Sequence, residues 1–291
     1  RARRSLVSAR RAAVVTPARS LHTAAMQLAA RVALILGVAA AAGCGKAPSR
    51  AADRVASAPI ASAPAAAAAA DAPRPPPLAF ISLGAAPAAA TTTVVLLHGY
   101  GAAGDDLLDL ARVLPVPATV RFVLPAAPIA LDGAGTERAW WHFDPDAAGD
   151  RRDQIPAGLA AARAQVDALL DQLEAAGPQR IVLGGFSQGA MLAVDVALQR
   201  PRPLAGLAVL SGTRIDGAAW RAGIGRARGV PVLISHGTAD DVLPVAEASA
   251  LRDDLRAAGA DVTWVEFPGG HTIVDETVAQ LAQLIGRVAA P

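Results

Sequence analysis

The 291-residue sequence contains one cysteine, Cys44. A single cysteine excludes a disulfide within the chain and argues against a cysteine-ligated metal site, because both need more than one thiol. Charge is also sparse, at 18% of residues, and aromatic residues make up only 3%, whereas 53% of the chain is hydrophobic. This composition is typical of a globular protein with a buried sheet and excludes a disordered or fibrous chain.

Acidic residues are missing from residues 1–44, which carry seven arginines. Removing these seven from the 27 basic residues of the chain leaves 20 against 25 acidic residues, so the remainder has a net charge near −5. The remainder has no basic stripe interleaved with aromatic residues. We therefore expect no nucleic-acid partner.

The N-terminal region also lacks an apolar run long enough to span a membrane, which takes about 20 residues. Its apolar stretch follows Arg31 and extends only from Val32 to Ala42, where small residues lead into Cys44. A short apolar stretch after a basic residue is typical of a cleaved export signal. We therefore interpret residues 1–44 as a leader region that contains a signal peptide, and we expect translation to start at Met26.

Cys44 resembles the lipobox cysteine of bacterial lipoproteins, although Ala41 stands where leucine is commonest. The resemblance implies lipidation at Cys44 and a lipid-anchored protein of the bacterial cell envelope. Two alternatives stay open. The leader could be an ordinary signal peptide that releases a secreted or periplasmic soluble protein, or it could be an organellar transit peptide.

Two further regions follow the leader. Residues 45–77 are dominated by alanine, proline and serine and contain too few large apolar residues to form a core, so we predict a disordered tether. Residues 78–291 carry the pattern of a folded domain. Predicted strands lie at 78–83, 93–97, 120–124, 180–183, 204–210, 230–235 and 262–267, and predicted helices at 157–175, 188–199, 245–258 and 277–288.

Most of these strands are nearly continuous apolar runs, and helical patterns separate them. Such runs are typical of strands that are buried on both faces of a parallel sheet. The sequence therefore predicts an α/β domain with a mostly parallel central sheet and helices on both faces.

The sharpest chemical signal is Gly-Phe-Ser-Gln-Gly at residues 185–189, between a predicted strand and a predicted helix. A nucleophile on a tight strand-to-helix turn needs a strained backbone, and side chains two residues away on either side must be absent. Gly185 and Gly189 meet that need. The helix start then directs backbone N–H groups at a developing oxyanion, which makes Ser187 the predicted nucleophile.

A serine hydroxyl needs a base to accept its proton, and a histidine is expected in that role. The histidines of the chain are His22, His98, His142, His236 and His271. His271 alone lies after the last predicted strand and before the last predicted helix, where the order serine–aspartate–histidine places the base. We predict that His271 is the base.

The third residue holds the imidazole in the correct tautomer and should follow a strand between Ser187 and His271. The predicted strand at 230–235 leads into a loop that contains Asp240 and Asp241. Their positions alone leave both residues open, and one of them could instead cap the next helix.

Two backbone N–H donors are expected to stabilise the oxyanion. Gln188, the residue after the nucleophile, supplies one, and the loop after an early strand supplies the other. That loop begins with His-Gly-Tyr-Gly at residues 98–101. We therefore predict Tyr100 and Gln188 as the donors.

These motifs together resemble the phospholipase/carboxylesterase family of small α/β-hydrolases, which includes acyl-protein thioesterases. The resemblance covers about Leu78 to Val288. It rests on the motifs at 98–101 and 185–189, on His-Gly-Thr-Ala-Asp at 236–240, and on Gly270-His271. It implies an α/β-hydrolase fold without a large lid domain, Asp240 as the acid, and Trp140 and Trp141 beside the substrate pocket.

The implied activity is cleavage of small carboxylic esters or thioesters by a serine hydrolase through an acyl-enzyme, without a metal or organic cofactor. A peptidase or polyester depolymerase would use the same triad of Ser187, Asp240 and His271. A silent hydrolase scaffold that binds a ligand at the cell envelope is the alternative outside enzymes.

Overall fold

A computed structural model describes residues 75–143, 154–177 and 180–290. The predicted leader, Met26 and Cys44 lie outside the described residues, as does nearly all of the predicted tether. Among the described helices, none combines the length and the apolar character needed to span a membrane.

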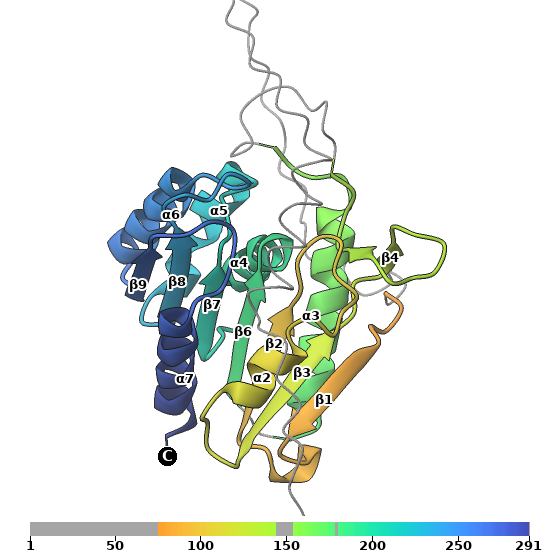
Figure 1. The fold of residues 1–291 in the computed structure, drawn as a ribbon. Helices are drawn as coiled ribbons and strands as arrows, with labels where there is room; N and C mark the ends of the chain where they lie inside the picture. Colours follow the sequence, from red (N-terminus) through yellow and green to blue (C-terminus); the bar gives the residue numbers. More distant parts are fainter. Residues whose placement is uncertain (1–74, 144–153, 178–179, 291) are drawn as a thin grey trace, which may run out of the picture.

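A seven-stranded sheet forms the centre of the domain (Figure 1). Its order is β1-β3-β2-β6-β7-β8-β9, and only the pairing of β1 with β3 is antiparallel. The strands are β1 (Phe80–Gly84), β2 (Thr92–Leu97), β3 (Val120–Pro125), β6 (Arg180–Phe186), β7 (Gly206–Leu210), β8 (Pro231–Gly237) and β9 (Asp261–Phe267). The prediction of a mostly parallel sheet is confirmed.

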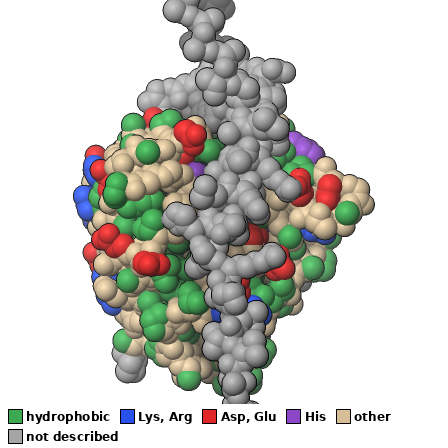
Figure 2. All heavy atoms as spheres, in the orientation of Figure 1, with side chains coloured by type: hydrophobic (Ala, Val, Ile, Leu, Met, Phe, Trp, Pro, Cys, Tyr) green, Lys and Arg blue, Asp and Glu red, His purple; other side chains and the backbone are tan. Residues whose placement is uncertain are grey.

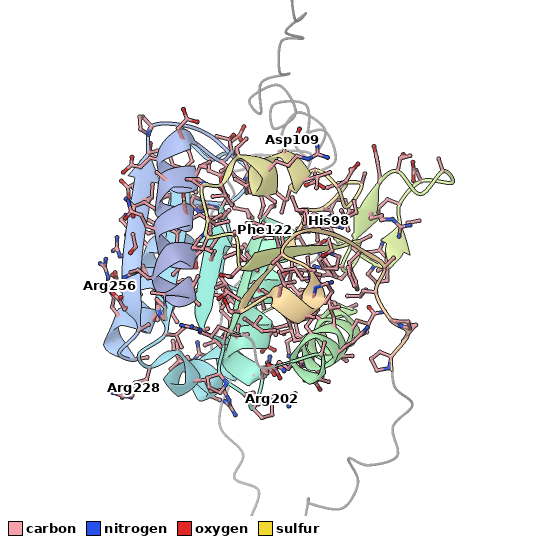
Figure 3. All side chains as sticks on the ribbon, turned by 90° about the horizontal axis from the view of Figure 1, so that it is seen from below. His98, Asp109, Phe122, Arg202, Arg228 and Arg256 are labelled. Carbon is pink, nitrogen blue, oxygen red and sulfur yellow. The ribbon has the colours of Figure 1, made fainter. Side chains whose placement is uncertain are left out.

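Helices cover both faces of this sheet, as predicted. One face carries α2 (Leu108–Val113) and α7 (Asp275–Ala289). The other carries α3 (Leu159–Ala175), α4 (Gln188–Gln199), α5 (Gly217–Gly223) and α6 (Val245–Ala257). Seen along the layers, Asp109 of α2 and Arg202 lie on opposite sides of the sheet (Figure 3).

Alternation along the strands explains the two layers. In β2, Val94 and Leu96 belong to the core under α2 and α7, whereas Val95 and Leu97 belong to the core on the other face. Successive side chains of a strand point to opposite faces, so a fully apolar strand supplies both cores at once. This is why the predicted strands are continuous apolar runs.

Some elements were not expected from the sequence. They are the short helices α2 and α5, the 3-10 turns at Pro87–Ala89 and Ile224–Ala227, and a hairpin of β4 (Ile129–Ala130) with β5 (Arg138–Ala139). Each is too short to show a clear periodicity. The described residues contain no separate lid domain.

Candidate active site

The predicted site residues follow the carboxyl ends of parallel strands. Ser187 comes directly after β6, Tyr100 lies in the loop after β2, Asp240 lies in the loop after β8, and His271 lies in the loop after β9. Because parallel strands end at the same edge of the sheet, these loops gather on one side of the domain, which is where α/β sheets bind ligands.

Ser187 occupies a strained turn between β6 and α4. Its φ of 53° and ψ of −117° are unusual for a residue with a side chain. The N–H of Ser187 donates to the carbonyl of Leu210 at 2.9 Å, which fixes the turn to β7. The residue is partly exposed, unlike its buried neighbours Phe186 and Gln188.

The glycines on either side allow this turn because there is no room for a side chain. A Cβ at Gly185 would lie 2.4 Å from the backbone of Gly189. A Cβ at Gly189 would lie 2.1 Å from the carbonyl oxygen of Leu97 in β2. Helix α4 therefore begins in direct backbone contact with the neighbouring strand.

His271 and Asp240 form a buried pair. The Nδ1 of His271 donates to Oδ2 of Asp240 at 2.7 Å, and both side chains are almost completely buried. The ring of His271 also lies 4.8 Å from the ring of Phe186, the residue before Ser187. Asp241, the other aspartate of the loop, is exposed and makes no such contact with His271 among the described residues.

The carboxylate of Asp240 is held on both oxygens. Its Oδ1 accepts the backbone N–H groups of Val242 and Leu243, at 3.0 and 2.8 Å. Burial alone would raise the pKa of Asp240, but its contacts with the imidazoles of His236 and His271 and with these N–H groups hold that pKa well below its usual range. The group is therefore an anion at neutral pH.

His236 is a member of this cluster that the sequence did not assign to the site. It is fully buried, and its Nε2 lies 2.8 Å from the carbonyl oxygen of Leu243 and 3.2 Å from Oδ2 of Asp240. A carbonyl accepts hydrogen bonds, so Nε2 carries the proton, and Nδ1 has no partner among the described residues. The only sequence signal was its place in the motif that also contains Asp240.

The loop after β2 lies against the nucleophile. A Cβ at Gly99 would lie 3.4 Å from the Cβ of Ser187. The backbone N–H of Tyr100 donates to no acceptor within the described part of the chain. Gln188 is the first residue of α4, so its N–H has no acceptor within the helix. Both predicted oxyanion donors are thus available at this edge.

His98, the first residue of that loop, has a structural role. Its Nδ1 donates to the carbonyl of Gly99 at 2.7 Å, and its Nε2 accepts the N–H of Ala127 at 2.9 Å. Burial lowers the pKa of His98, which agrees with a neutral ring that donates on one side and accepts on the other. His98 directly follows the last residue of β2 and is labelled in Figure 3.

A mostly apolar cavity of about 300 Å³ adjoins the site. Met191, one turn after Ser187, and Leu243, whose N–H donates to Asp240, place it next to the start of α4 and the loop of Asp240. Trp141 lines this cavity, whereas Trp140 is buried and is not among its lining residues. The full lining is Trp141, His142, Phe143, Gln154, Ile155, Pro156, Ala157, Met191, Thr213, Ile215 and Leu243.

The described residues hold no group of three or more histidine, cysteine, aspartate or glutamate side chains that could bind a metal ion. On the face seen in Figure 2, acidic side chains lie at several separate places among hydrophobic and neutral ones. The site itself presents a serine hydroxyl, an imidazole, a carboxylate and backbone N–H groups.

Comparison with known proteins adds independent information. Residues 79–288 match the model of the phospholipase/carboxylesterase family. Acyl-protein thioesterase 1 of Gibberella zeae is 28% identical over 217 residues, which cover 69% of this chain and 92% of that protein.

Solved structures agree with this result. Esterase PE8 is 32% identical, with a TM-score of 0.64, and the match covers 73% of this chain and 99% of that one. Acyl-protein thioesterase 2 of Zea mays is 25% identical, with a TM-score of 0.58, and the match covers 73% of this chain and all of that one.

Proposed function

The chain belongs to the phospholipase/carboxylesterase family of α/β-hydrolases and is a carboxylic ester hydrolase, and on that premise we propose that Ser187, His271 and Asp240 form its catalytic triad. The observation that carries the proposal is the hydrogen bond between His271 and Asp240 at the edge where Ser187 occupies its strained turn. A hydroxyl, an imidazole and a buried carboxylate in this order are the components of nucleophilic acyl transfer.

Each residue has one task in the proposed mechanism. Ser187 attacks the acyl carbon while His271 accepts its proton, and Asp240 stabilises the imidazolium that forms. The N–H groups of Tyr100 and Gln188 stabilise the oxyanion of the tetrahedral intermediate. His271 then protonates the leaving alcohol or thiol, and water cleaves the acyl-enzyme by the same route.

The cavity beside the site is the proposed acyl pocket. Its walls are mostly apolar, including Trp141, Met191 and Leu243, and contain no side chain of aspartate, glutamate, lysine or arginine among the described residues. Such walls favour an uncharged, hydrophobic acyl group over a charged one, because a charge would lose its hydration there. Relatives named as an esterase and as acyl-protein thioesterases support esters and thioesters as substrates.

Labelling with a fluorophosphonate tests the nucleophile, because only an activated serine reacts rapidly with it. We expect the wild-type protein to be labelled at Ser187 and Ser187→Ala to be unlabelled. Hydrolysis of p-nitrophenyl esters should fall by roughly 10³-fold or more in Ser187→Ala, since the triad acts as a unit. A folded Ser187→Ala protein with activity near that of the wild type would refute the proposal.

A second proposal concerns location and rests on the sequence alone. We propose that Cys44 is lipidated and holds the domain at the bacterial cell envelope. When the full-length protein is expressed in a bacterium, it should fractionate with membranes, and Cys44→Ser should appear in the soluble fraction. Unchanged membrane association of Cys44→Ser would contradict this proposal and leave the triad unaffected.

A further inference from the structure

The side chain of Gln188 has a role that its backbone N–H does not explain. It is fully buried, and both ends of its amide are used. Its Oε1 accepts the N–H of Trp140 at 3.0 Å, and its Nε2 donates to the carbonyl of Trp141 at 2.9 Å. The side chain of the first residue of α4 therefore hydrogen-bonds to two consecutive residues of a segment about 48 positions away in the chain.

The same segment also hydrogen-bonds to the loop that carries the other oxyanion donor. The indole Nε1–H of Trp140 donates to the carbonyl of His98 at 3.0 Å, and Trp140 is almost completely buried. On the far side of Tyr100, the N–H of Gly101 donates to the carbonyl of Arg138 at 2.8 Å. Tyr100 thus lies in a short stretch that is tied to the segment 138–141 on both sides.

These contacts connect two donors that come from separate elements. Tyr100 belongs to the loop after β2, and Gln188 begins α4. An oxyanion hole works only if its donors are held within about 0.5 Å of their productive positions before the reaction. A hydrogen-bonded connection between the two elements favours this, and segment 138–141 makes hydrogen bonds to both of them.

We propose that Trp140 and the side chain of Gln188 are positioning residues that fix the spacing of the two oxyanion donors. The inference rests on the proposed function of Ser187, Tyr100 and Gln188. Trp140 acts through the carbonyl of His98, and the Gln188 amide acts through residues 140 and 141. The two tryptophans therefore differ in role: Trp140 holds the loop of Tyr100 in position, whereas Trp141 lines the cavity.

Trp140→Phe tests the proposal by removing the indole N–H while keeping an aromatic ring. Gln188→Met removes both amide contacts with little change in volume. We expect kcat to fall about 10- to 100-fold in each variant, less than the 10²- to 10³-fold typical of losing a whole donor. The KM for a p-nitrophenyl ester should change by less than about threefold, since the lost interaction acts in the transition state.

An alkyl boronic acid gives a readout that separates positioning from general damage. It forms a tetrahedral adduct with the serine and places an oxygen in the oxyanion hole. Its inhibition constant should weaken in Trp140→Phe and Gln188→Met by about the factor by which kcat/KM falls. A merely structural role would lower the melting temperature and leave this constant unchanged in the folded protein.

Trp220→Phe is the matched control. Trp220 is also a buried tryptophan, and its indole N–H donates to Asp195 at 3.0 Å, outside the proposed site. We expect Trp220→Phe to lose stability and to keep kcat and boronate affinity within about twofold of the wild type at a temperature where all the proteins are folded. If Trp140→Phe behaves like Trp220→Phe in kcat and boronate affinity, the inference is wrong.

The remaining outcomes are also decisive. If Trp140→Phe does not fold, Gln188→Met carries the test alone, because it removes both amide contacts, and unchanged boronate affinity in that folded variant would refute the inference. If the wild-type protein is not labelled by the fluorophosphonate, the proposed function fails first. If the wild type is labelled and the variants are unaffected, only the positioning role fails.

Discussion

The two sides of the site are built by different means. On the nucleophile side, five consecutive residues at 185–189 form the end of β6, the turn and the start of α4. On the acid–base side, Asp240 and His271 are 31 positions apart and belong to loops after different strands. The nucleophile is placed by backbone packing, and the imidazole is placed by hydrogen bonds between buried side chains.

This difference determines how each side should respond to substitution. Backbone atoms in close contact have nowhere to move, so an added methyl group on the nucleophile side should disrupt the fold. A buried hydrogen bond can be weakened in steps, so changes on the acid–base side should lower activity by graded amounts. Substitutions at four positions test this contrast, beginning with the one expected to be most severe.

Gly189→Ala should have the largest effect. The new Cβ would lie 2.1 Å from the carbonyl oxygen of Leu97 and 2.6 Å from that of His98, and both are backbone atoms. We expect a loss of folded protein, or a fall of about 3 kcal/mol or more in the free energy of unfolding, measured by urea denaturation.

Gly286→Ala is the control for this change. Gly286 also lies in a helix, but a Cβ there would meet nothing within 4 Å. Alanine should stabilise this position by about 0.5–1 kcal/mol, because glycine weakens a helix interior. Equal midpoints for Gly189→Ala and the wild type would show that the nucleophile turn tolerates a side chain.

Asp240→Asn should have the next largest effect. The amide would keep the size of the carboxylate but would present a donor or a neutral oxygen to Nδ1 of His271, which disturbs the tautomer that the base needs. We expect kcat to fall by about 10⁴-fold while the protein stays folded. Asp241→Asn, an exposed neighbour, should keep wild-type kcat, and a similar loss in both variants would contradict the assignment of Asp240.

His236→Met and His236→Gln should have a smaller, graded effect. Methionine removes the proton that His236 shares between Leu243 and Asp240, whereas the glutamine amide can place a donor near the position of Nε2. We expect about a tenfold lower kcat for His236→Met, typical of the loss of a supporting contact, and substantial recovery in His236→Gln. Equal losses in both variants would mean that imidazole packing matters and the donor does not.

Ile155→Ser should have the smallest effect, since it concerns the rim of the cavity that both sides share. Ile155 lines the cavity and is 68% exposed, so it can give only part of the contact of a buried side chain. We expect the KM for a long-chain p-nitrophenyl ester to rise about fivefold, corresponding to about 1 kcal/mol of lost apolar contact, with little change for the acetate. Val113→Ser, an exposed apolar residue on α2, should change neither value.

Much of the fold was open to prediction from local patterns. The apolar runs predicted the strands of the main sheet to within a few residues, and α3, α4, α6 and α7 were expected from their helical patterns. Helix α5 and the β4–β5 hairpin were missed because elements of two to seven residues have too few positions to establish a period. Their form depends on the neighbours against which they pack.

The candidate site also has features that local sequence predicted and features that it did not. The motif at 185–189 points to Ser187 through local sequence alone, and His271 is indicated by its position between the last predicted strand and the last predicted helix. The contact between Asp240 and His236 did not follow from the sequence. It depends on the conformation of the loop after β8, which Asp240 stabilises through its hydrogen bonds to backbone N–H groups. The same is true of the amide of Gln188, whose partners are in a distant segment.

The sequence by itself determined the order of strands and helices and the absence of side chains around the turn of Ser187, because these depend on residues within a few positions of one another. The tertiary structure shows that Asp240, the aspartate that the family resemblance implied, faces His271. It alone decided which tryptophan lines the cavity and how segment 138–141 joins the two elements of the oxyanion hole. Those contacts join residues far apart in the chain, and their geometry is set by the packing of the whole sheet.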